Sequence, residues 1–265
     1  MSEPGIPASS ERPRHAGAFP SSVRAVAHVY VDRLDDDAVV EDDDAHHLRR
    51  VLRVRDGEVV TAADGHGRWR AYRVMSVDAP AISLHATTEL AHEPRLVPEL
   101  TVACALTKGE RPELVVQKLT ELGVDGVTLV RAARSVVQWD DARAARALTR
   151  LVRIAREAGA QCRRARLPLL DGPVSVEELA RCPGLVVADR VGLSPAALPV
   201  LGDGTWTVAV GPEGGFDDDE LATLAGAPRL TLGPHVLRAE TAAIAAAAAL
   251  VDRRAVGTDR SEREE

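Results

Sequence analysis

The sequence predicts an α/β fold: a parallel sheet covered by helices on both faces, preceded by a smaller domain built of strands. From Leu100 onward, short apolar runs alternate with helical patterns, which is typical of parallel strands joined by crossover helices. Between Ala27 and Leu90, short stretches rich in β-branched and aromatic residues favour strands. The chain has 265 residues, of which 45% are hydrophobic, enough for one large domain or two ordinary ones.

Composition divides the chain into four segments. Residues 1–25 are rich in Pro, Ser, Gly and charge and are predicted to be a flexible arm. Residues 26–95 form the small domain, and a shift in composition at 91–98 indicates a linker. Residues 98–253 form the α/β domain, and residues 254–265 are predicted to be a charged tail.

Each expected strand of the small domain is short, and the four lie at residues 27–31, 58–64, 69–78 and 81–90. The pairs Asp64–Gly65 and His66–Gly67 favour a turn between two of them. The acidic runs Asp35–Asp37 and Glu41–Asp44 are interpreted as loop and helix-start residues.

In the α/β domain the expected strands are LTVACAL, GVTLV, GLVVAD, TWTVAV and RLTL, and the expected helices span 112–122, 140–158, 217–225 and 239–253. The stretch 239–251 is apolar all round, which predicts a buried helix.

Motifs and composition exclude several classes of protein. The chain has no G-x-G-x-x-G fingerprint, no G-x-x-x-x-G-K-[ST] P-loop and no G-x-S-x-G nucleophile elbow. Its longest apolar run is too short to span a bilayer, and its first residues lack the apolar core of a secretory signal. The three cysteines are far apart, and the adjacent His46 and His47 point in different directions on a helix. We therefore expect neither a metal site nor a membrane partner, and a cytoplasmic location.

The net charge of −7 by itself argues against a nucleic-acid partner, but the distribution of the charges along the chain weakens that argument. Residues 131–166 hold ten arginines against three acidic residues, a local charge of +7, so the remaining chain carries −14. One face of the helix that starts near Asp140 carries an arginine stripe: Arg143, Arg146, Arg150 and Arg153. The other face carries the apolar Ala144, Leu148, Leu151, Val152 and Ala155, with Ile154 as an exception. A second cluster is Arg49, Arg50, Arg53 and Arg55. Such clusters indicate either a solvated surface or an RNA-binding one.

The glycine-rich segment 211–216, GPEGGF, directly follows the strand TWTVAV. Glycines there let the backbone approach a ligand closely, and ligands of open α/β sheets bind at the carboxyl ends of strands. The alternative is a tight turn without a ligand.

The segment 232–242, LGPHVLRAETA, leads into the buried helix, and Arg238 at the start of that helix needs a partner. That partner is either Glu240 or a carbonyl of a ligand or substrate.

These segments carry a resemblance to a known family. GPEGGF, the Glu220 after it, and LGPHVLRAETA resemble motifs of the bacterial 16S ribosomal RNA (uracil-N3)-methyltransferases, the small subunit methyltransferase E family of the SPOUT class. The segments HHLRRVLR, LTKG, QKLTELGV, RSVV and EAGAQCR are similar to further family elements. The matching segments follow one another in order from about residue 27 to 250. One departure is Cys162, which stands where Ser is common in the family.

The resemblance implies an N-terminal PUA-like β-barrel followed by a SPOUT α/β domain with a C-terminal trefoil knot. It also implies S-adenosyl-L-methionine (SAM) as the methyl donor, a homodimer, and methylation of a uridine of 16S rRNA in the assembled or assembling small ribosomal subunit. The implied cofactor contacts are Ala188, Asp189, Gly211, Pro212, Glu213, Gly214, Gly215, Leu232, Gly233, Val236, Leu237, Arg238 and Thr241.

Uracil N3 lies on the pairing edge and carries a proton, so the base must be unpaired or extruded. We expect Arg238 to stabilise the imide anion and Glu213 or Glu240 to accept the proton. The expected RNA contacts are Arg49, Arg50, Arg53, Lys108, Arg134, Arg153 and Arg163. Two alternatives stay open: an RNA-associated assembly factor without turnover, and a SPOUT enzyme with another target, such as tRNA.

Overall fold

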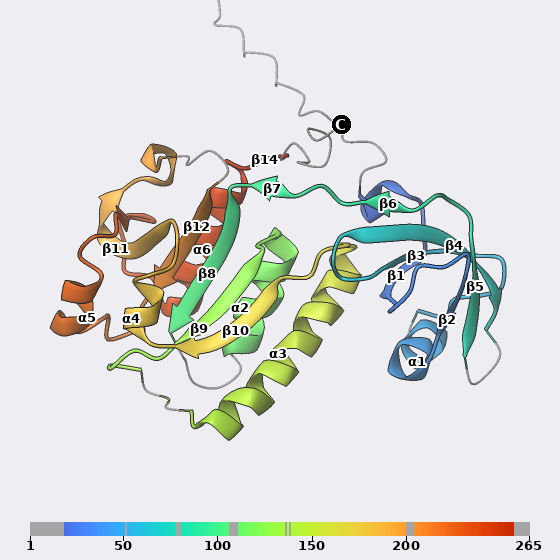
Figure 1. Ribbon diagram of the computed structural model, residues 1–265, viewed down its shortest axis with the longest axis horizontal. Helices are drawn as coiled ribbons and strands as arrows, with labels where there is room; N and C mark the ends of the chain where they lie inside the picture. The colour runs from blue at the N-terminus through green and yellow to red at the C-terminus, as the bar shows by residue number, and fades with distance from the viewer. Residues whose placement is uncertain are drawn as a thin grey trace, which may run out of the picture.

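The computed structural model describes residues 19–50, 52–77, 81–105, 111–135, 137, 139–199 and 204–256. These residues form two domains, and the long helix α3 (Asp141–Cys162) reaches from the second domain towards the first (Figure 1). The strand-rich first domain and the α/β second domain agree with the fold class that the sequence predicts.

The first domain is a curled sheet that forms a half-barrel packed against helix α1. Its elements are the 3-10 helix η1 (Pro20–Ser22), β1 (Ala27–Tyr30), β2 (Asp37–Val40), α1 (Asp42–Arg50), β3 (Val59–Ala63), β4 (Arg68–Ser76), β5 (Ile82–Ala86) and β6 (Ala91–His92). The strand order is β1-β3-β4-β5-β2 with β6 paired to β4, and only the β1–β3 pair among them is parallel. Ala45 and Leu48 of α1 share one core with Val60, Ile82 and Leu84 of the sheet.

The second domain contains a six-stranded sheet in the order β10-β9-β8-β12-β11-β13, with every neighbouring pair parallel. Its elements are β7 (Leu96–Val97), β8 (Glu99–Ala105), α2 (Arg111–Leu122), β9 (Gly126–Val130), α3, β10 (Leu169–Val174), α4 (Val176–Leu179), β11 (Leu185–Leu193), the 3-10 helix η2 (Pro195–Ala197), β12 (Thr205–Val210), α5 (Asp218–Thr223), β13 (Arg229–Leu230), α6 (Ala239–Val251) and β14 (Ala255–Val256).

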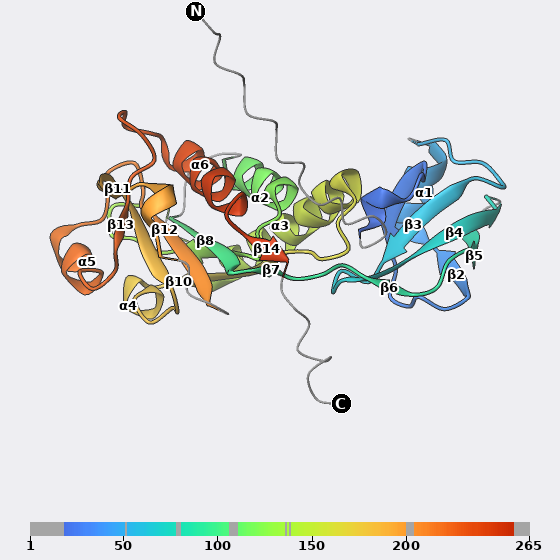
Figure 2. The same cartoon turned by 90° about the horizontal axis from the view of Figure 1, so that it is seen from above.

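Helices cover both faces of this sheet, as the alternation of apolar runs and helical patterns predicts. Helices α2, α3 and α6 lie on one face, and the short helices α4 and α5 lie on the other (Figure 2). Leu119 and Leu151 belong to the core on the first face, and Leu179 and Leu224 to the core on the second. Helix α6 lies in the first of these cores, which confirms that its all-apolar sequence marks a buried helix.

Several elements are not predicted by the sequence, among them β2, β10 and α4. Strand β2 begins in the acidic run that we interpreted as a loop, and its residues alternate between exposed and buried. Strand β10 contains Gly172 and Pro173, a pair that favours a turn. Because β10 is an edge strand of the sheet, it tolerates a proline that cannot donate a hydrogen bond to a neighbour.

Parts of the predicted arm and tail belong to the folded domains. Residues 1–18 of the predicted arm lie outside the described residues, whereas Pro20 is buried and Val23 packs against the first domain. The Arg254 side chain is fully buried, and β14 pairs with β7, so residues 254–256 are part of the second domain. On α3, Val152 is 48% exposed, which corrects its predicted place on the packed face. Ile154, predicted as an exception, packs partly into the core.

Hydrogen bonds fix the end of α3 to the first domain. Arg156 Nη2 donates to the Tyr30 carbonyl (2.9 Å), and Arg163 Nη2 donates to the Ala25 carbonyl (2.7 Å). The Tyr30 hydroxyl donates to the carbonyl of Arg164 (2.8 Å). Because these bonds cross between the domains at one place, they fix how the half-barrel sits relative to the parallel sheet.

Candidate functional site

The main candidate site is a cavity of about 570 Å³ at the carboxyl ends of β11, β12 and β13. Two loops form most of its wall: residues 211–217, which follow β12, and residues 231–238, which follow β13. This is the edge at which open α/β sheets bind ligands. The structure therefore brings together the two segments that carry the sequence motifs.

The first loop is a tight turn built on glycine. The Gly215 N–H donates to the Pro212 carbonyl (2.8 Å), and Gly215 has a φ of +70°, where side chains other than glycine are strained. A Cβ atom on Gly211 would come within 3.2 Å of the Phe216 ring, which is buried beneath the loop. Glycine at these positions therefore permits both the turn and its close packing.

The second loop is attached to the strand beside it. The Thr231 N–H donates to the Leu193 carbonyl (2.9 Å), and the Thr231 hydroxyl donates to the Arg190 carbonyl (3.2 Å). Gly233 has a φ of +144°, again a conformation that favours glycine. The loop ends at Arg238, the residue that precedes the first turn of α6.

A pair of opposite charges lies in the cavity wall. Arg229 Nη1 is 3.5 Å from Asp189 Oδ2, and Asp189 Oδ1 accepts a hydrogen bond from the Arg190 N–H (2.6 Å). Both side chains of the ion pair are partly exposed, so they remain accessible to a ligand. The cavity thus combines backbone groups, apolar side chains and one ion pair.

Most of the expected cofactor contacts line this cavity. They are Ala188, Asp189, Gly211, Pro212, Glu213, Gly214, Gly215, Leu232, Gly233, Val236 and Leu237. Arg238 and Thr241 are not among the lining residues, although each directly precedes a residue that is, Ala239 and Ala242 respectively. Of the expected catalytic residues, Glu213 lies in the wall, Arg238 is exposed, and Glu240 is half-buried in the first turn of α6.

The expected RNA contacts are placed in different environments. Arg50, Arg53 and Arg153 are exposed, and Arg49 is half-buried. Lys108 lies outside the described residues. Arg134 and Arg163 direct their guanidinium groups at backbone carbonyls of the chain itself.

Sequence reasoning missed several lining residues, including Val187, Arg190, Val210, Phe216 and Arg229. Val187 lies where β11 reaches the cavity and Val210 ends β12, so the rule that ligands bind at carboxyl ends of strands could have found them. Arg229 is forty residues from its partner Asp189, and no local pattern marks that pair.

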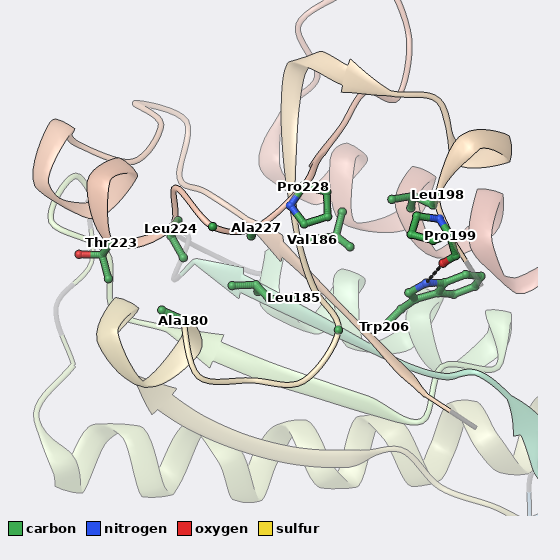
Figure 3. A pocket seen from close by; sticks show the side chains of 12 residues that line it. Ala180, Leu185, Val186, Leu198, Pro199, Trp206, Thr223, Leu224, Ala227 and Pro228 are labelled. Carbon is green, nitrogen blue, oxygen red and sulfur yellow. Dashed lines mark hydrogen bonds between the residues drawn. The ribbon is translucent and has the colours of Figure 1, made fainter. Parts of the chain in front are cut away.

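A second cavity, of about 420 Å³, lies near the amino ends of β11 and β12 (Figure 3). The Trp206 indole N–H donates to the Pro199 carbonyl at its edge (3.2 Å), and Leu185, Val186 and Leu198 contribute apolar surface. No charged side chain lines it among the described residues. It therefore offers less for chemistry than the cavity at the carboxyl ends.

Sequence families match both domains. The family described as the RNA methyltransferase domain matches residues 94–251, and the RNA methyltransferase PUA domain matches residues 40–84. A ribosomal RNA small subunit methyltransferase E of Mycobacterium bovis is 37% identical over 235 residues, which cover 83% of this chain and 89% of that protein. The chain belongs to the ribosomal RNA small subunit methyltransferase E family. A Bacillus subtilis member of the family is 30% identical and covers 78% of this chain and 87% of its own.

Solved structures show the same architecture. A small subunit methyltransferase E of Neisseria gonorrhoeae, bound to S-adenosyl methionine, has a TM-score of 0.75 and 27% identity, covering 86% of this chain and 97% of that one. A putative methyltransferase of Legionella pneumophila with the bound cofactor SAM has a TM-score of 0.77 and 28% identity, and the match covers 87% of this chain and 98% of that one. The methyltransferase E fold therefore extends over both domains of this chain.

Two kinds of feature are absent from the described residues. Within the described ranges, no three His, Cys, Asp or Glu side chains gather in a way that could hold a metal ion. None of the helices in the same ranges is both long and apolar enough to cross a membrane.

Proposed function

We propose that this chain is an enzyme that transfers a methyl group from SAM to N3 of a uridine in 16S rRNA of the small ribosomal subunit. The observation that carries the proposal is the cavity between loops 211–217 and 231–238, in a chain of a family with SAM-bound members. The uracil-N3 specificity comes from the family resemblance. Its RNA substrate makes the cytoplasm the expected location.

The cavity fits SAM in both size and chemistry. Its volume of about 570 Å³ falls within the range of roughly 300–1,000 Å³ that is usual for small-molecule sites. Val187, Val210 and Phe216 provide apolar surface suited to an adenine ring. Asp189 and Arg229 provide opposite charges suited to amino and carboxylate groups.

The proposed catalytic residues of this chain are Arg238, Glu213 and Glu240. When bound, SAM supplies an electrophilic methyl group. Arg238, exposed beside the cavity, stabilises negative charge that develops on the uracil oxygens as N3 loses its proton. Glu213 or Glu240 accepts that proton. Displacement at a methyl group needs alignment more than covalent help, so positioning of the base is the main contribution of the chain.

The arginine stripe of α3 is the proposed RNA surface, together with Arg49, Arg50, Arg53 and Lys108. Arg143, Arg146, Arg150 and Arg153 are all exposed on one side of the helix. We expect charge reversal of Arg50 and Arg53, or of Arg143 and Arg146, to make the salt dependence of RNA binding shallower. The expected change is about 0.7–0.9 in the log–log slope for each phosphate that the variant no longer neutralises. An unchanged slope would exclude that cluster from the interface.

We also propose that the chain around the cavity forms the trefoil knot of the SPOUT class. Leu230 of β13 pairs with Ala188 and again with Leu193, two positions of the single strand β11. Thr231 donates hydrogen bonds to the carbonyls of Leu193 and Arg190. Segment 188–193 therefore curls around residues 230–231. Such an arrangement is expected in a knot, where one segment of the chain passes through a loop formed by another.

A homodimer is the proposed assembly. Val191 lies in β11, one residue beyond Arg190 of the cavity wall, and Val236 lies in loop 231–238; they are 79% and 76% exposed. Apolar side chains this exposed favour burial against a partner. We expect Val191→Asp to shift the molar mass measured by light scattering from dimer towards monomer, whereas Met75→Asp on the first domain leaves it unchanged.

The proposed function is tested by two measurements on the wild-type protein. Titration calorimetry should show binding of SAM, and incubation with methyl-labelled SAM and unmodified small subunits should place label in 16S rRNA. Binding of SAM and RNA without transfer of label would favour the assembly factor, and label in tRNA alone would favour another target. No heat on titration with SAM would contradict the proposal.

A further inference from the structure

The glycine-rich loop 211–217 is held by Arg134, which also contributes to the cavity wall. This residue lies in the segment between β9 and α3, and its Nη1 donates to the carbonyls of Gly214 (3.1 Å) and Phe216 (3.3 Å). The Arg134 side chain also packs against the loop, since a Cβ atom on Gly214 would lie 3.4 Å from Arg134 Cβ. One guanidinium therefore binds two carbonyls of the loop that carries the sequence motif.

Glu220, in the first turn of α5, completes the connection between the two segments. Its Oε2 accepts the Asp217 N–H (2.8 Å), and the Asp217 side chain accepts the Glu220 N–H (2.9 Å), a reciprocal capping box. The other oxygen, Oε1, accepts the N–H of Ala133, the residue next to Arg134 (2.7 Å). Helix capping uses one carboxylate oxygen, so the second oxygen is available to tie segment 131–135 to the loop.

These bonds fix two peptide planes of the loop at both ends. In a trans peptide the C=O and the following N–H point in opposite directions. The peptide after Gly214 directs its C=O at Arg134 and its N–H at the Pro212 carbonyl. The peptide after Phe216 directs its C=O at Arg134 and its N–H at Glu220. Neither plane can rotate without breaking bonds at both ends.

We propose that Arg134 and Glu220 are positioning residues, which hold loop 211–217 in its binding shape before SAM arrives. A loop that is ordered in advance loses less conformational entropy on binding, so affinity rises without any new contact to the ligand. This inference rests on the proposed function, because it takes the cavity as the SAM site. It also changes the role expected of Arg134, whose bonds to two carbonyls would have to break for its Nη1 to contact a phosphate.

The first test compares SAM binding by Arg134→Ala, Arg134→Lys and Arg181→Ala with that of the wild type. We expect Arg134→Ala to bind about tenfold more weakly, and Arg134→Lys about threefold, because one ammonium group can serve only part of the pair of carbonyls. Arg181 is exposed in the same domain, so its variant should stay within twofold. In the methylation assay, KM for SAM should rise about tenfold in Arg134→Ala while kcat changes less than threefold.

A second measurement needs neither SAM nor activity. Hydrogen exchange of the cofactor-free protein should be at least fivefold faster at the amides of Gly215 and Asp217 in Arg134→Ala. Glu220→Gln should have the same effect at Asp217, since an amide group cannot accept both N–H groups as a carboxylate does. Glu177→Gln, an exposed change on α4, is the matched control.

The salt dependence of RNA binding separates the two roles of Arg134. The positioning role predicts an unchanged slope for Arg134→Ala, whereas an RNA contact predicts a slope shallower by about one. Wild-type affinity for SAM in Arg134→Ala, with either slope, overturns the positioning role while the proposed function stands. Absence of SAM binding by the wild type overturns the proposed function, and the positioning role with it.

Discussion

The imidazole of His28 in β1 donates through Nε2 to the carbonyl of Arg164, the second residue after the end of α3 (3.0 Å). A carbonyl can only accept, so Nε2 carries the proton and the neutral Nδ1 accepts from the Thr61 hydroxyl (2.8 Å). The Arg164 guanidinium extends the other way, to the carbonyls of Thr120 (2.7 Å) and Val124 (3.0 Å) at the end of α2. One residue therefore joins the half-barrel to the second domain.

This relationship predicts a dependence of stability on pH. The pKa of His28 is lowered from its usual 6.5 to about 4, chiefly by burial; the hydrogen bond to the Arg164 carbonyl opposes this shift, and the positive charge of Arg163 adds to it. Neutral His28 therefore stabilises the fold above pH 6.5, and this contribution is lost as pH falls from 6.5 towards 4. The loss amounts to roughly 3 kcal/mol.

Urea unfolding between pH 7.5 and pH 4.5 checks this expectation, with His28→Gln as the comparison. The wild type should lose more free energy of unfolding than His28→Gln, because the variant has no imidazole to protonate. Equal losses in the two proteins would show that His28 does not titrate in this way.

A second prediction concerns Arg254, whose side chain is fully buried. It donates to the carbonyls of Leu96 (3.1 Å), Pro98 (2.8 Å) and Gly123 (2.9 Å) and forms an ion pair with Asp125. Arg254→Ala should lower the free energy of unfolding by about 3–5 kcal/mol, because it leaves the partly buried Asp125 carboxylate and three backbone carbonyls without their donor.

The matched control for Arg254 is Arg33→Ala, since the Arg33 side chain is 81% exposed. That change should stay within about 0.5 kcal/mol. Urea unfolding of both variants measures the difference, and a similar small effect in the two would contradict the role assigned to Arg254.

Replacement of Gly215 is predicted to weaken SAM binding. Its φ of +70° strains any side chain, although open space surrounds it. Gly215→Ala should bind SAM about fivefold more weakly, which matches a strain of ~1 kcal/mol. Gly215→Asn should lose less, because asparagine tolerates this conformation better. Gly226→Ala, also in open space but without a positive φ, should match the wild type in calorimetry.

Arg238 is predicted to act on the chemical step. Arg238→Ala should lower kcat for methyl transfer about 10²–10³-fold, as loss of one anion-stabilising group does in other enzymes. Because Arg238 is not among the residues that line the cavity, affinity for SAM should change less than threefold. Arg238→Lys should recover part of the rate. Near-normal turnover by Arg238→Ala would remove this residue from the mechanism.

The sequence predicted the parallel sheet, the buried α6 and both cavity loops, because periodicity and glycine-rich segments are local signals. It did not predict which arginines are free to meet RNA. Helical periodicity correctly placed the stripe from Arg143 to Arg153 on an exposed face. By contrast Arg134, Arg163 and Arg164 donate to backbone carbonyls far away in the sequence. Much of the +7 charge of segment 131–166 therefore serves the fold, and only tertiary contacts reveal it.

Mapping the product on 16S rRNA is the decisive test of the proposed reaction. Unmodified small subunits are incubated with the protein and SAM, and the rRNA is examined by primer extension and by mass spectrometry of its nucleosides. A methyl group on N3 blocks base pairing, so we predict a single new stop of primer extension at a uridine, together with N3-methyluridine in the digest. No new stop and no N3-methyluridine, under conditions in which the protein binds SAM, would show that the chain does not carry out this reaction.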